Sequence, residues 1–311
     1  MLQIIALSEQ VVEGETLAVN VNVNGQPIVL FRDIDGSVCA LEDRCPHRRV
    51  PLSLGKVIKG ELRCAYHGWT FSGLTGACTD IPNLSDEETI PAKLKAQSFT
   101  VKEQNGFIYL LDSDTSVAEF PAMPFSDQPV DAELSGRVAV PIGLEQYRAV
   151  LLDGPENLLA FSGVGITDFY LGGVEDKEQS LSIDRAADWS WRDRKPSWKS
   201  SDYPLIIRSE VCKHESSALV SVLNTSEQPL MEVYIVIVQS GRGTSNILWR
   251  ARRYSACFDS APLAIRLKLY VFDDFVKVKE APSAMSINNL IVGPSTALIP
   301  VDSVSNPSPS L

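Results

Sequence analysis

Hydrophobic and polar positions alternate along the first third of the chain, and turn signals interrupt the alternation at short intervals. Residues 17–43 read LAVNVNVNGQPIVLFRDIDGSVCALED, three apolar-rich runs separated by Asn-Gly and Asp-Gly. These dipeptides favour tight β-hairpin turns. The stretches GWTFSGLTGACTDI at 68–81 and FTVKEQNGFIYLL at 99–111 continue the same habit. The pattern predicts a small antiparallel β domain over residues 1–115.

The remainder of the chain has a mixed pattern. Residues 112–131 are polar and carry three prolines, which is typical of a linker or domain crossing. A helix is expected over 147–161, broken at Gly154-Pro155, followed by strands at 179–184, 204–211, 217–223, 231–239 and 245–252. Residues 262–280 fit helix and strand about equally, and the Ser- and Pro-rich residues 293–311 predict an ordered strap or a free tail. The second domain, residues 116–311, is therefore expected to be α+β.

Length and charge limit the classes of function. A chain of 311 residues is long enough for two domains with separate cores. Its net charge of −11 makes nucleic acid a poor partner. No apolar run approaches the roughly 18 residues that span a bilayer, so no membrane segment is expected. The first residues, MLQIIALSEQ, have no basic region before an apolar stretch, so a cytoplasmic location is the default expectation.

Two of the three histidines lie in one pair of short segments, CPHRRVPLSLG at 45–55 and CAYHGW at 64–69. Each segment supplies one cysteine and one histidine, so Cys45, His47, Cys64 and His67 are the candidate metal ligands. Two thiolates and two imidazoles can bind zinc, but zinc fingers usually pair cysteines in one segment and histidines in the other. One Cys and one His from each loop instead suits a two-iron cluster with both cysteines on one iron, the Rieske [2Fe–2S] arrangement.

These segments, with LRCAYHGWTF and GACTDIP, resemble the N-terminal domain of Rieske non-haem iron oxygenases, particularly vanillate-O-demethylase-like and pheophorbide-a-oxygenase-like members. The resemblance covers about residues 15–112. It implies an all-β Rieske [2Fe–2S] domain followed by a helix-grip (START-like) domain. Gly68 and Trp69 match the family's cluster-packing positions. Cys78 falls where the family often has a cysteine and is expected to pack rather than to bind the cluster.

The same resemblance implies that metal ligands typical of the family are missing from the second domain. The family binds a catalytic iron there through two histidines and a carboxylate, and the histidines come from a helix that aligns with ENLLAFSGVGITD at 156–168. The family's bridging aspartate falls on Ala160, its first histidine on Gly163 and its second on Asp168. Asp273 or Asp274 matches the approximate place of the carboxylate ligand. The only remaining histidine is His214, expected to be structural or at the surface, so no mononuclear iron is expected.

The resemblance implies three possible roles. The first is a non-catalytic, electron-transferring subunit of a hetero-oligomeric, trimer-based Rieske oxygenase, with a ferredoxin or flavin reductase as donor and a catalytic subunit as partner. The second is a catalytic monooxygenase or demethylase with an altered iron site. The third is a free-standing electron carrier whose second domain binds a ligand.

Two segments are candidates for contacts with other proteins. Arg44, Arg48 and Arg49 crowd the first cysteine loop of an acidic chain, which suits docking of an acidic reductase or ferredoxin. Solvated charges, with an ion pair to Glu42 or Asp43, are the alternative. The tryptophan-rich ADWSWRDRKPSW at 187–198 could line a partner interface or tuck its rings inward as an ordinary loop.

Overall fold

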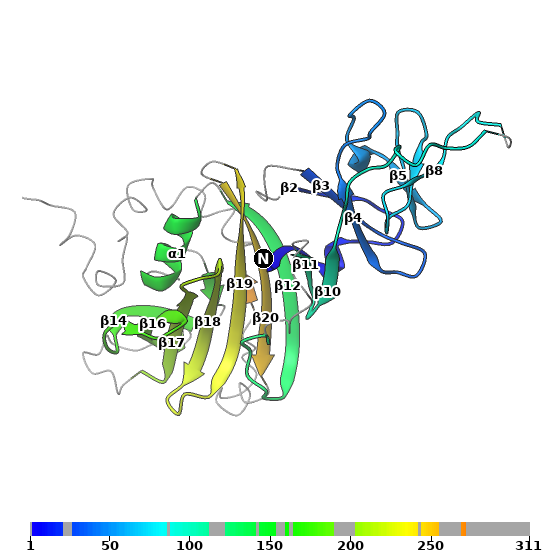
Figure 1. Ribbon diagram of the computed structural model, residues 1–311. Helices are drawn as coiled ribbons and strands as arrows, with labels where there is room; N and C mark the ends of the chain where they lie inside the picture. Colours follow the sequence, from blue (N-terminus) through cyan, green and yellow to red (C-terminus); the bar gives the residue numbers. More distant parts are fainter. Residues whose placement is uncertain are drawn as a thin grey trace, which may run out of the picture. The chain divides into compact units, whose positions relative to one another are not determined.

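The computed structural model describes residues 2–20, 27–85, 88–111, 122–140, 143–153, 159–161, 164–189, 203–241, 244–254 and 269–271. The chain divides into two compact units, Met1–Met123 and Pro124–Leu311. Figure 1 shows the first unit in blue to cyan and the second in green to orange. The predicted boundary at residue 115 lies outside the described residues.

The first unit is built from strands in three small antiparallel sheets. One sheet has the order β1-β11-β10, from Leu2–Leu7, Phe107–Leu111 and Val101–Gln104. The second has the order β2-β3-β4-β9, from Leu17–Asn20, Pro27–Arg32, Val38–Glu42 and Ser98–Phe99. The third has the order β5-β6-β7-β8, from Lys56–Ile58, Glu61–Arg63, Thr70–Phe71 and Cys78–Asp80. Two short 3-10 helices, η1 (Ser8–Gln10) and η2 (Leu52–Leu54), complete the described elements.

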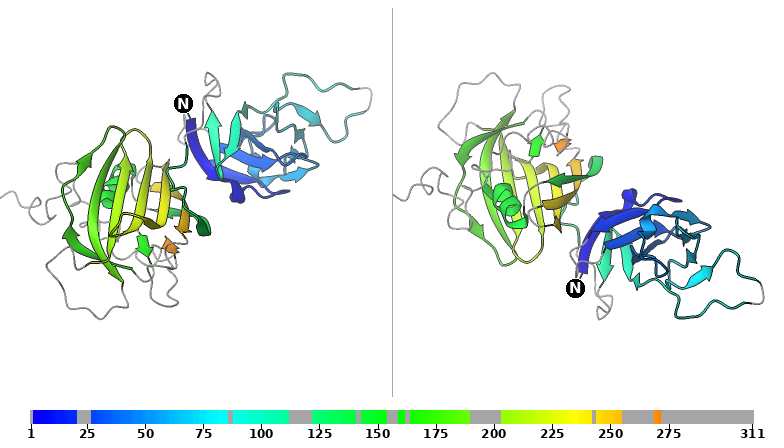
Figure 2. Two further views of the ribbon diagram at one scale, coloured as in Figure 1. Left: turned by 90° about the horizontal axis from the view of Figure 1, so that it is seen from below. Right: turned by 90° about the horizontal axis from the view of Figure 1, so that it is seen from above.

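The second unit is one large antiparallel sheet with a helix on it. The strands follow the order β12-β20-β19-β18-β17-β16-β14, and β15 pairs with β16. Their bounds are Val130–Val140, Thr244–Tyr254, Pro229–Gly241, Ser217–Asn224, Leu205–Cys212, Ser180–Trp189, Val164–Tyr170 and, for β15, Glu175–Asp176. Helix α1, Leu144–Asp153, contacts β16 to β19, and Figure 2 shows it against one face of the sheet. A separate pair joins β13 (Leu159–Phe161) to β21 (Leu269–Val271).

The register of the large sheet separates an apolar face from a charged one. Ile183, Ser209, Val220, Val233 and Ala251 stand opposite one another on five neighbouring strands. All five are buried, and the four apolar ones belong to the core cluster that includes residues of α1. Successive residues of a strand point to opposite faces, so the adjacent row falls on the other side of the sheet.

That adjacent row carries charge. Arg208 of β17 donates two hydrogen bonds to Asp184 of β16, at 2.8 and 2.7 Å. Glu232 of β19, buried, accepts a hydrogen bond at 2.8 Å from the backbone N–H of Ser126 and another from the hydroxyl of Tyr254. The apolar row thus forms a core under α1, and the charged row carries an ion pair between β16 and β17 and hydrogen bonds from Ser126 and Tyr254 to Glu232.

The expected α+β class is confirmed. Each of the five strands predicted in the second domain corresponds to one of β16 to β20, because alternating apolar residues let one face pack on α1. Strand β12 is not among the predicted elements: the predicted linker over 112–131 includes its first two residues, and no element is predicted over 132–140, although AELSGRVAV alternates apolar and polar positions. Residues 262–280 were compatible with helix or strand, and the part of them that is described, 269–271, forms strand β21. The rest of 262–280 and the tail 293–311 lie outside the described residues.

One expectation is corrected. The helix expected over 147–161 is helical only to Asp153, where α1 ends, since residues 159–161 form strand β13 and residues 164–170 form β14. The segment aligned with the family's iron-binding helix is therefore strand wherever it is described. Of the two alternatives for the tryptophan-rich segment, Trp189 agrees with the inward-facing one: it lies in β16, is 3% exposed and belongs to the core under α1. The remainder of the tryptophan-rich segment lies outside the described residues.

In the described part of the chain, no helix has the length and apolar character that crossing a membrane requires.

Candidate metal centre

The four predicted ligands lie on two loops at the ends of neighbouring elements of the first unit. Cys45 and His47 follow β4 and precede η2, while Cys64 and His67 join β6 to β7. Cys45 and Cys64 belong to the same hydrophobic cluster as Leu41 of β4 and Leu62 of β6. Each loop is therefore anchored in the domain core through the strand that precedes it.

The two loops have the same backbone conformation. In the first loop, the N–H of Cys45 donates to the carbonyl of Val50 at 2.8 Å, and the N–H of Arg49 donates to the carbonyl of Cys45 at 2.7 Å. In the second loop, the N–H of Cys64 donates to the carbonyl of Trp69 at 2.8 Å, and the N–H of Gly68 donates back to Cys64 at 3.1 Å. Each loop is thus a closed turn that starts at its cysteine, so the two turns present their ligands in the same way.

The fifth residue of each turn has a left-handed backbone. The φ angle is 74° at Gly68 and 60° at Arg49. Glycine adopts this region without strain, whereas a residue with a Cβ pays about 1–2 kcal/mol. A Cβ at Gly68 would also lie 2.8 Å from Cγ of Pro82. The second turn therefore requires glycine, and the first tolerates arginine only with compensating contacts.

The ligands are grouped by type. Cys45 and Cys64 are both buried, and their sulfur atoms lie within hydrogen-bonding reach of each other. The His47 and His67 rings, both exposed, have centroids 4.6 Å apart. Among the described residues, no three His, Cys, Asp or Glu side chains converge as a single-ion site requires. A thiol pair beside an imidazole pair is the arrangement that two irons need, one bound by sulfur and one by nitrogen.

The pKa shifts of Cys45 and His47 fit such a centre. Burial raises the pKa of the Cys45 thiol to about 11, while the backbone N–H groups of His47 and Arg48 act in the opposite direction. A thiolate at this place is stable only with added positive charge, which ferric ions supply. The pKa of His47 is lowered by partial desolvation and by the nearby His67 and Arg48, which favours the neutral imidazole that binds a metal.

Aromatic rings and packing hold the imidazoles. The indole of Trp69 stacks on the His47 ring at 4.4 Å between centroids, with 5° between the ring planes. The Tyr66 ring lies 4.0 Å from His67. Cys78 is buried in the cluster that contains both loop cysteines, and its sulfur lies 3.6 Å from the carbonyl oxygen of Asp80. These contacts agree with the packing roles expected for Trp69 and Cys78.

Two carboxylates at the end of β4 brace the first loop. Glu42, 8% exposed, accepts a hydrogen bond at 3.2 Å from the guanidinium of Arg49. Asp43, 7% exposed, accepts hydrogen bonds from the backbone N–H of Ser53 at 2.6 Å and from its hydroxyl at 2.7 Å. The hydroxyl of Thr16 donates to the carbonyl of Ser53 at 2.7 Å. The loop is therefore tied to the domain at both ends.

Comparison with known proteins identifies this unit. Residues 1–100 match the Rieske [2Fe-2S] domain family. This part of the chain is a Rieske [2Fe-2S] domain. The predicted Rieske cofactor is thereby confirmed; such a cluster, when bound, takes up and releases one electron.

Two of the proteins similar to the Rieske domain are oxygenases. The 4beta-methylsterol monooxygenase of Methylococcus capsulatus is 45% identical over 101 residues, 32% of this chain and 27% of that protein. The 3-chlorobenzoate-3,4-dioxygenase oxygenase subunit of Comamonas testosteroni is 36% identical over 105 residues, 34% of this chain and 24% of that protein. The matched region thus spans only about a quarter of either relative.

The fold similarity extends beyond the Rieske domain. The crystal structure of dicamba monooxygenase bound to dicamba matches with a TM-score of 0.61 at 21% identity, covering 83% of this chain and 78% of that chain. Coverage of this extent includes much of the second unit, so the similarity in fold is not limited to the Rieske domain.

The residues aligned with the family's second metal site are only partly described. Ala160 lies in β13 opposite Tyr270, and Asp168 lies in β14. Gly163, Asp273 and Asp274 lie outside the described residues. His214 is exposed in the bend between β17 and β18, in line with the surface role expected for it.

The sequence motif identified the candidate ligands but not the side chains that brace them. The Glu42–Arg49 pair was one of two alternatives, whereas Ser53, Thr16 and the Tyr66 ring contact were not foreseen. These contacts depend on how each loop closes, and no residue spacing signals that.

Proposed function

We propose that this chain is an electron-transferring, non-catalytic subunit of a hetero-oligomeric Rieske oxygenase. Cys45, His47, Cys64 and His67 would hold the [2Fe–2S] cluster. The electron would come from a ferredoxin or flavin reductase and leave to the mononuclear iron of a catalytic partner subunit. The role of the chain's own residues is to fix the cluster at an exposed edge where other proteins can approach it.

The count of histidines carries this proposal. The whole chain has three. Two lie on the cluster loops, and His214 is exposed at the β17–β18 bend. A facial triad needs two histidines and a carboxylate on one iron, and a single surface imidazole cannot supply it. The loops that would hold the cluster are complete, so the chain retains an electron-carrying site without a matching site for oxygen.

The relatives support the setting of this role. Two of the similar proteins are a monooxygenase and an oxygenase subunit. A second unit with the fold of dicamba monooxygenase suits assembly beside a catalytic chain of the same architecture. The two alternative functions have less support. A catalytic iron site on this chain would require ligands other than a pair of histidines. A free-standing electron carrier would not explain why the second unit shares the fold of a monooxygenase.

Nitric oxide binding tests the proposal, because it marks a mononuclear ferrous site that has open coordination positions. The cluster-loaded protein would be incubated anaerobically with ferrous iron, desalted and exposed to nitric oxide, with a catalytic Rieske monooxygenase as positive control. We expect no high-spin ferrous–nitrosyl EPR signal from this chain, as distinct from the dinitrosyl-iron signal that reaction of the cluster itself with nitric oxide gives. The triple variant Ala160→Asp, Gly163→His and Asp168→His should at most gain iron binding. A stoichiometric nitrosyl signal from the unsubstituted chain would overturn the proposal.

A further inference from the structure

The exposed end of the Rieske domain carries arginines that form no ion pair with a carboxylate of the described residues. Arg44 and Arg48 are both exposed, and neither has an ion-pair partner within the part of the chain that the structure describes. The neighbouring carboxylates of Glu42 and Asp43 are turned inward, to Arg49 and Ser53. The positive field of this surface is therefore not cancelled locally, although the chain carries a net charge of −11.

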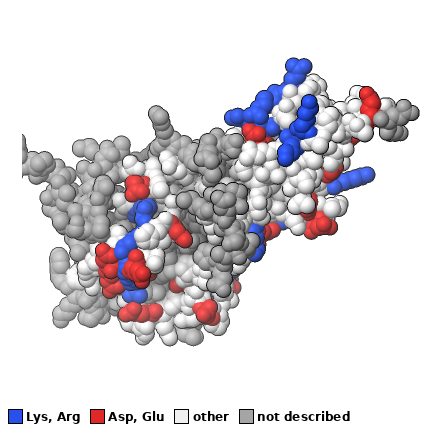
Figure 3. Space-filling view, viewed as in Figure 1, with Lys and Arg blue, Asp and Glu red and all other residues white. Residues whose placement is uncertain are grey.

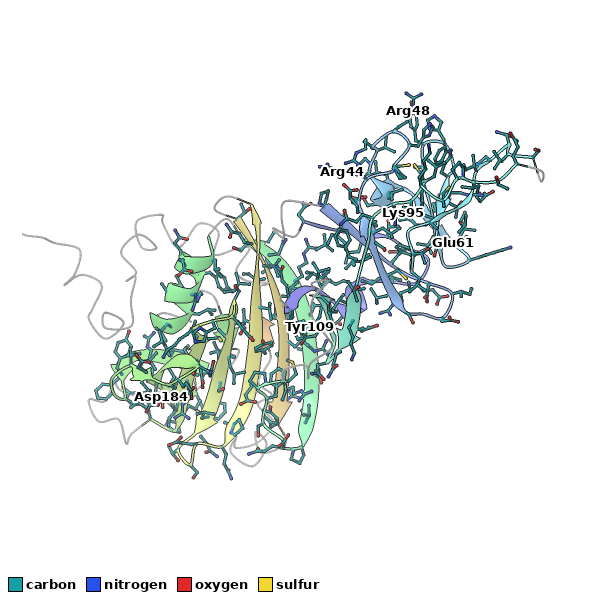
Figure 4. The ribbon with its side chains drawn as sticks, in the orientation of Figure 1. Arg44, Arg48, Glu61, Lys95, Tyr109 and Asp184 are labelled. Atoms are coloured by element: carbon teal, nitrogen blue, oxygen red, sulfur yellow. The ribbon has the colours of Figure 1, made fainter. Side chains whose placement is uncertain are left out.

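Figure 3 shows Lys and Arg side chains gathered over one end of this domain. Figure 4 places Arg44 and Arg48 at that end, away from Tyr109 of β11. Both arginines belong to the first cysteine loop: Arg44 precedes Cys45 and Arg48 follows His47. A protein attracted to these guanidinium groups would therefore arrive at the loop that carries half of the candidate ligands.

The surface beside the arginines suits protein contact. The His47 and His67 rings are exposed, and Tyr66, 62% exposed, lies against His67 at 4.0 Å between ring centroids. Tyrosine and arginine are the residue types that dominate binding energy at protein interfaces. An electron carrier seated here would stand close to the imidazole ligands without having to penetrate the domain.

We propose that Arg44, Arg48 and Tyr66 form the docking surface for an acidic one-electron donor protein. One electron would pass from the donor's reduced centre to the oxidised cluster, with no bond or proton exchanged. This inference rests on the proposed electron-transfer function and specifies the donor: a protein whose redox centre is ringed by carboxylates. Opposite charges would steer the encounter, and the arginines and tyrosine would fix its orientation.

The experiment uses the full chain with its cluster loaded and an acidic plant-type [2Fe–2S] ferredoxin as probe. Biolayer interferometry gives the association rate constant, and stopped-flow absorbance gives the rate of cluster reduction, each at low and high salt. The test variant is Arg44→Gln with Arg48→Gln. The control, Lys56→Gln with Lys59→Gln, removes the same charge from exposed positions of β5 and the β5–β6 turn, outside the two cysteine loops.

We expect the arginine variant to associate about tenfold more slowly than the control at low salt, within the range that electrostatic steering provides. The two should converge at high salt, where charges are screened. A variant with Arg44→Lys and Arg48→Lys should keep most of the rate, which separates lost charge from a disturbed loop. Cluster absorbance, measured beforehand, confirms that each variant is loaded.

Equal rates for the arginine variant and the lysine control would overturn the inference. So would the absence of measurable ferredoxin association with the unsubstituted protein at low salt. Both measurements report steps up to and including reduction of the cluster, so they do not depend on which group receives the electron afterwards. The nitric oxide experiment addresses that question separately, and the two proposals can therefore fail independently.

Discussion

The ion pair between Arg49 and Glu42 is predicted to hold the first cysteine loop in its closed turn, and substitution of Arg49 tests this. Arg49 keeps a left-handed backbone, φ 60°, where the matching position of the second loop has glycine. Its guanidinium lies 3.2 Å from the Glu42 carboxylate, whose side chain is 11% exposed against 58% for Arg49. The pair therefore joins a nearly buried anion to a cation that water reaches.

The magnitude follows from two opposing effects. Removing one partner of a fully buried ion pair costs about 3–5 kcal/mol, and the exposure of Arg49 reduces this to about 1–2 kcal/mol for Arg49→Ala. Arg49→Gly loses the same pair but relieves about 1 kcal/mol of left-handed strain. The alanine variant should thus be the least stable of the three proteins, with the glycine variant between it and the unsubstituted chain.

Cluster release to an iron chelator, followed by the loss of visible absorbance, reports opening of this loop. A loss of 1–2 kcal/mol should accelerate release by about five- to thirtyfold for Arg49→Ala when opening is in rapid equilibrium. Arg49→Gly should release its cluster roughly fivefold more slowly than Arg49→Ala, because it relieves about 1 kcal/mol of strain. Arg48→Ala, one residue away and without an ion pair among the described residues, is the matched control and should release its cluster at the original rate.

Two results would refute this reasoning. If Arg49→Ala released its cluster no faster than Arg48→Ala, the ion pair would contribute nothing to loop closure. If Arg49→Gly released it faster than Arg49→Ala, the left-handed backbone would not be a source of strain.

Three further substitutions test other parts of the Rieske domain. Gly68→Ala should destabilise the domain by about 1–3 kcal/mol and lower cluster loading, because the new Cβ would lie 2.8 Å from Cγ of Pro82 on a left-handed backbone. Thermal unfolding and iron content measure the two effects. Full loading with unchanged stability would contradict the prediction. Cys45→Ser should abolish the cluster and unfold the 40–80 region, so retained visible absorbance would show that the ligand assignment is wrong. The hydrogen bonds of Arg32 lower the pKa of Glu103, so the stability this pair provides is present above the ordinary carboxyl pKa and is lost as the pH falls through the depressed one. Glu103→Gln, which leaves the hydrogen bonds of Arg32 to backbone carbonyls in place, should therefore remove under about 1 kcal/mol at pH 7 and less at pH 2, as urea unfolding at both values would show, and an equal loss at both would count against the pair.

The sequence predicted the strands that pair in simple succession. Residues 204–211 and 217–223 alternate apolar and polar side chains, and they form β17 and β18 because one face of each packs under α1. Strand β12, by contrast, pairs with the distant β20 and carries exposed residues such as Leu134. Residues 132–140 of β12 read AELSGRVAV and alternate as a strand does, so its periodicity is present in the sequence, whereas its pairing with a strand more than a hundred residues away is not.

The same distinction holds for the candidate site: its metal ligands could be predicted from the sequence, and the contacts that brace their loops could not. The cysteines and histidines could be identified because chemistry demands those residue types at a fixed spacing. The bracing contacts from Glu42 to Arg49 and from Asp43 to Ser53 span seven and ten residues through a closed turn. Such contacts arise from the path of the backbone, so they became visible only with the fold.

The iron and acid-labile sulfide content of anaerobically purified protein, together with its dithionite-reduced EPR spectrum, tests the central claim most directly. A chain that carries one electron and has no oxygen-activating site should contain two irons and two sulfides and give a Rieske signal alone. A third iron per chain, outside the cluster, would show that this protein holds its own catalytic metal and would contradict the account.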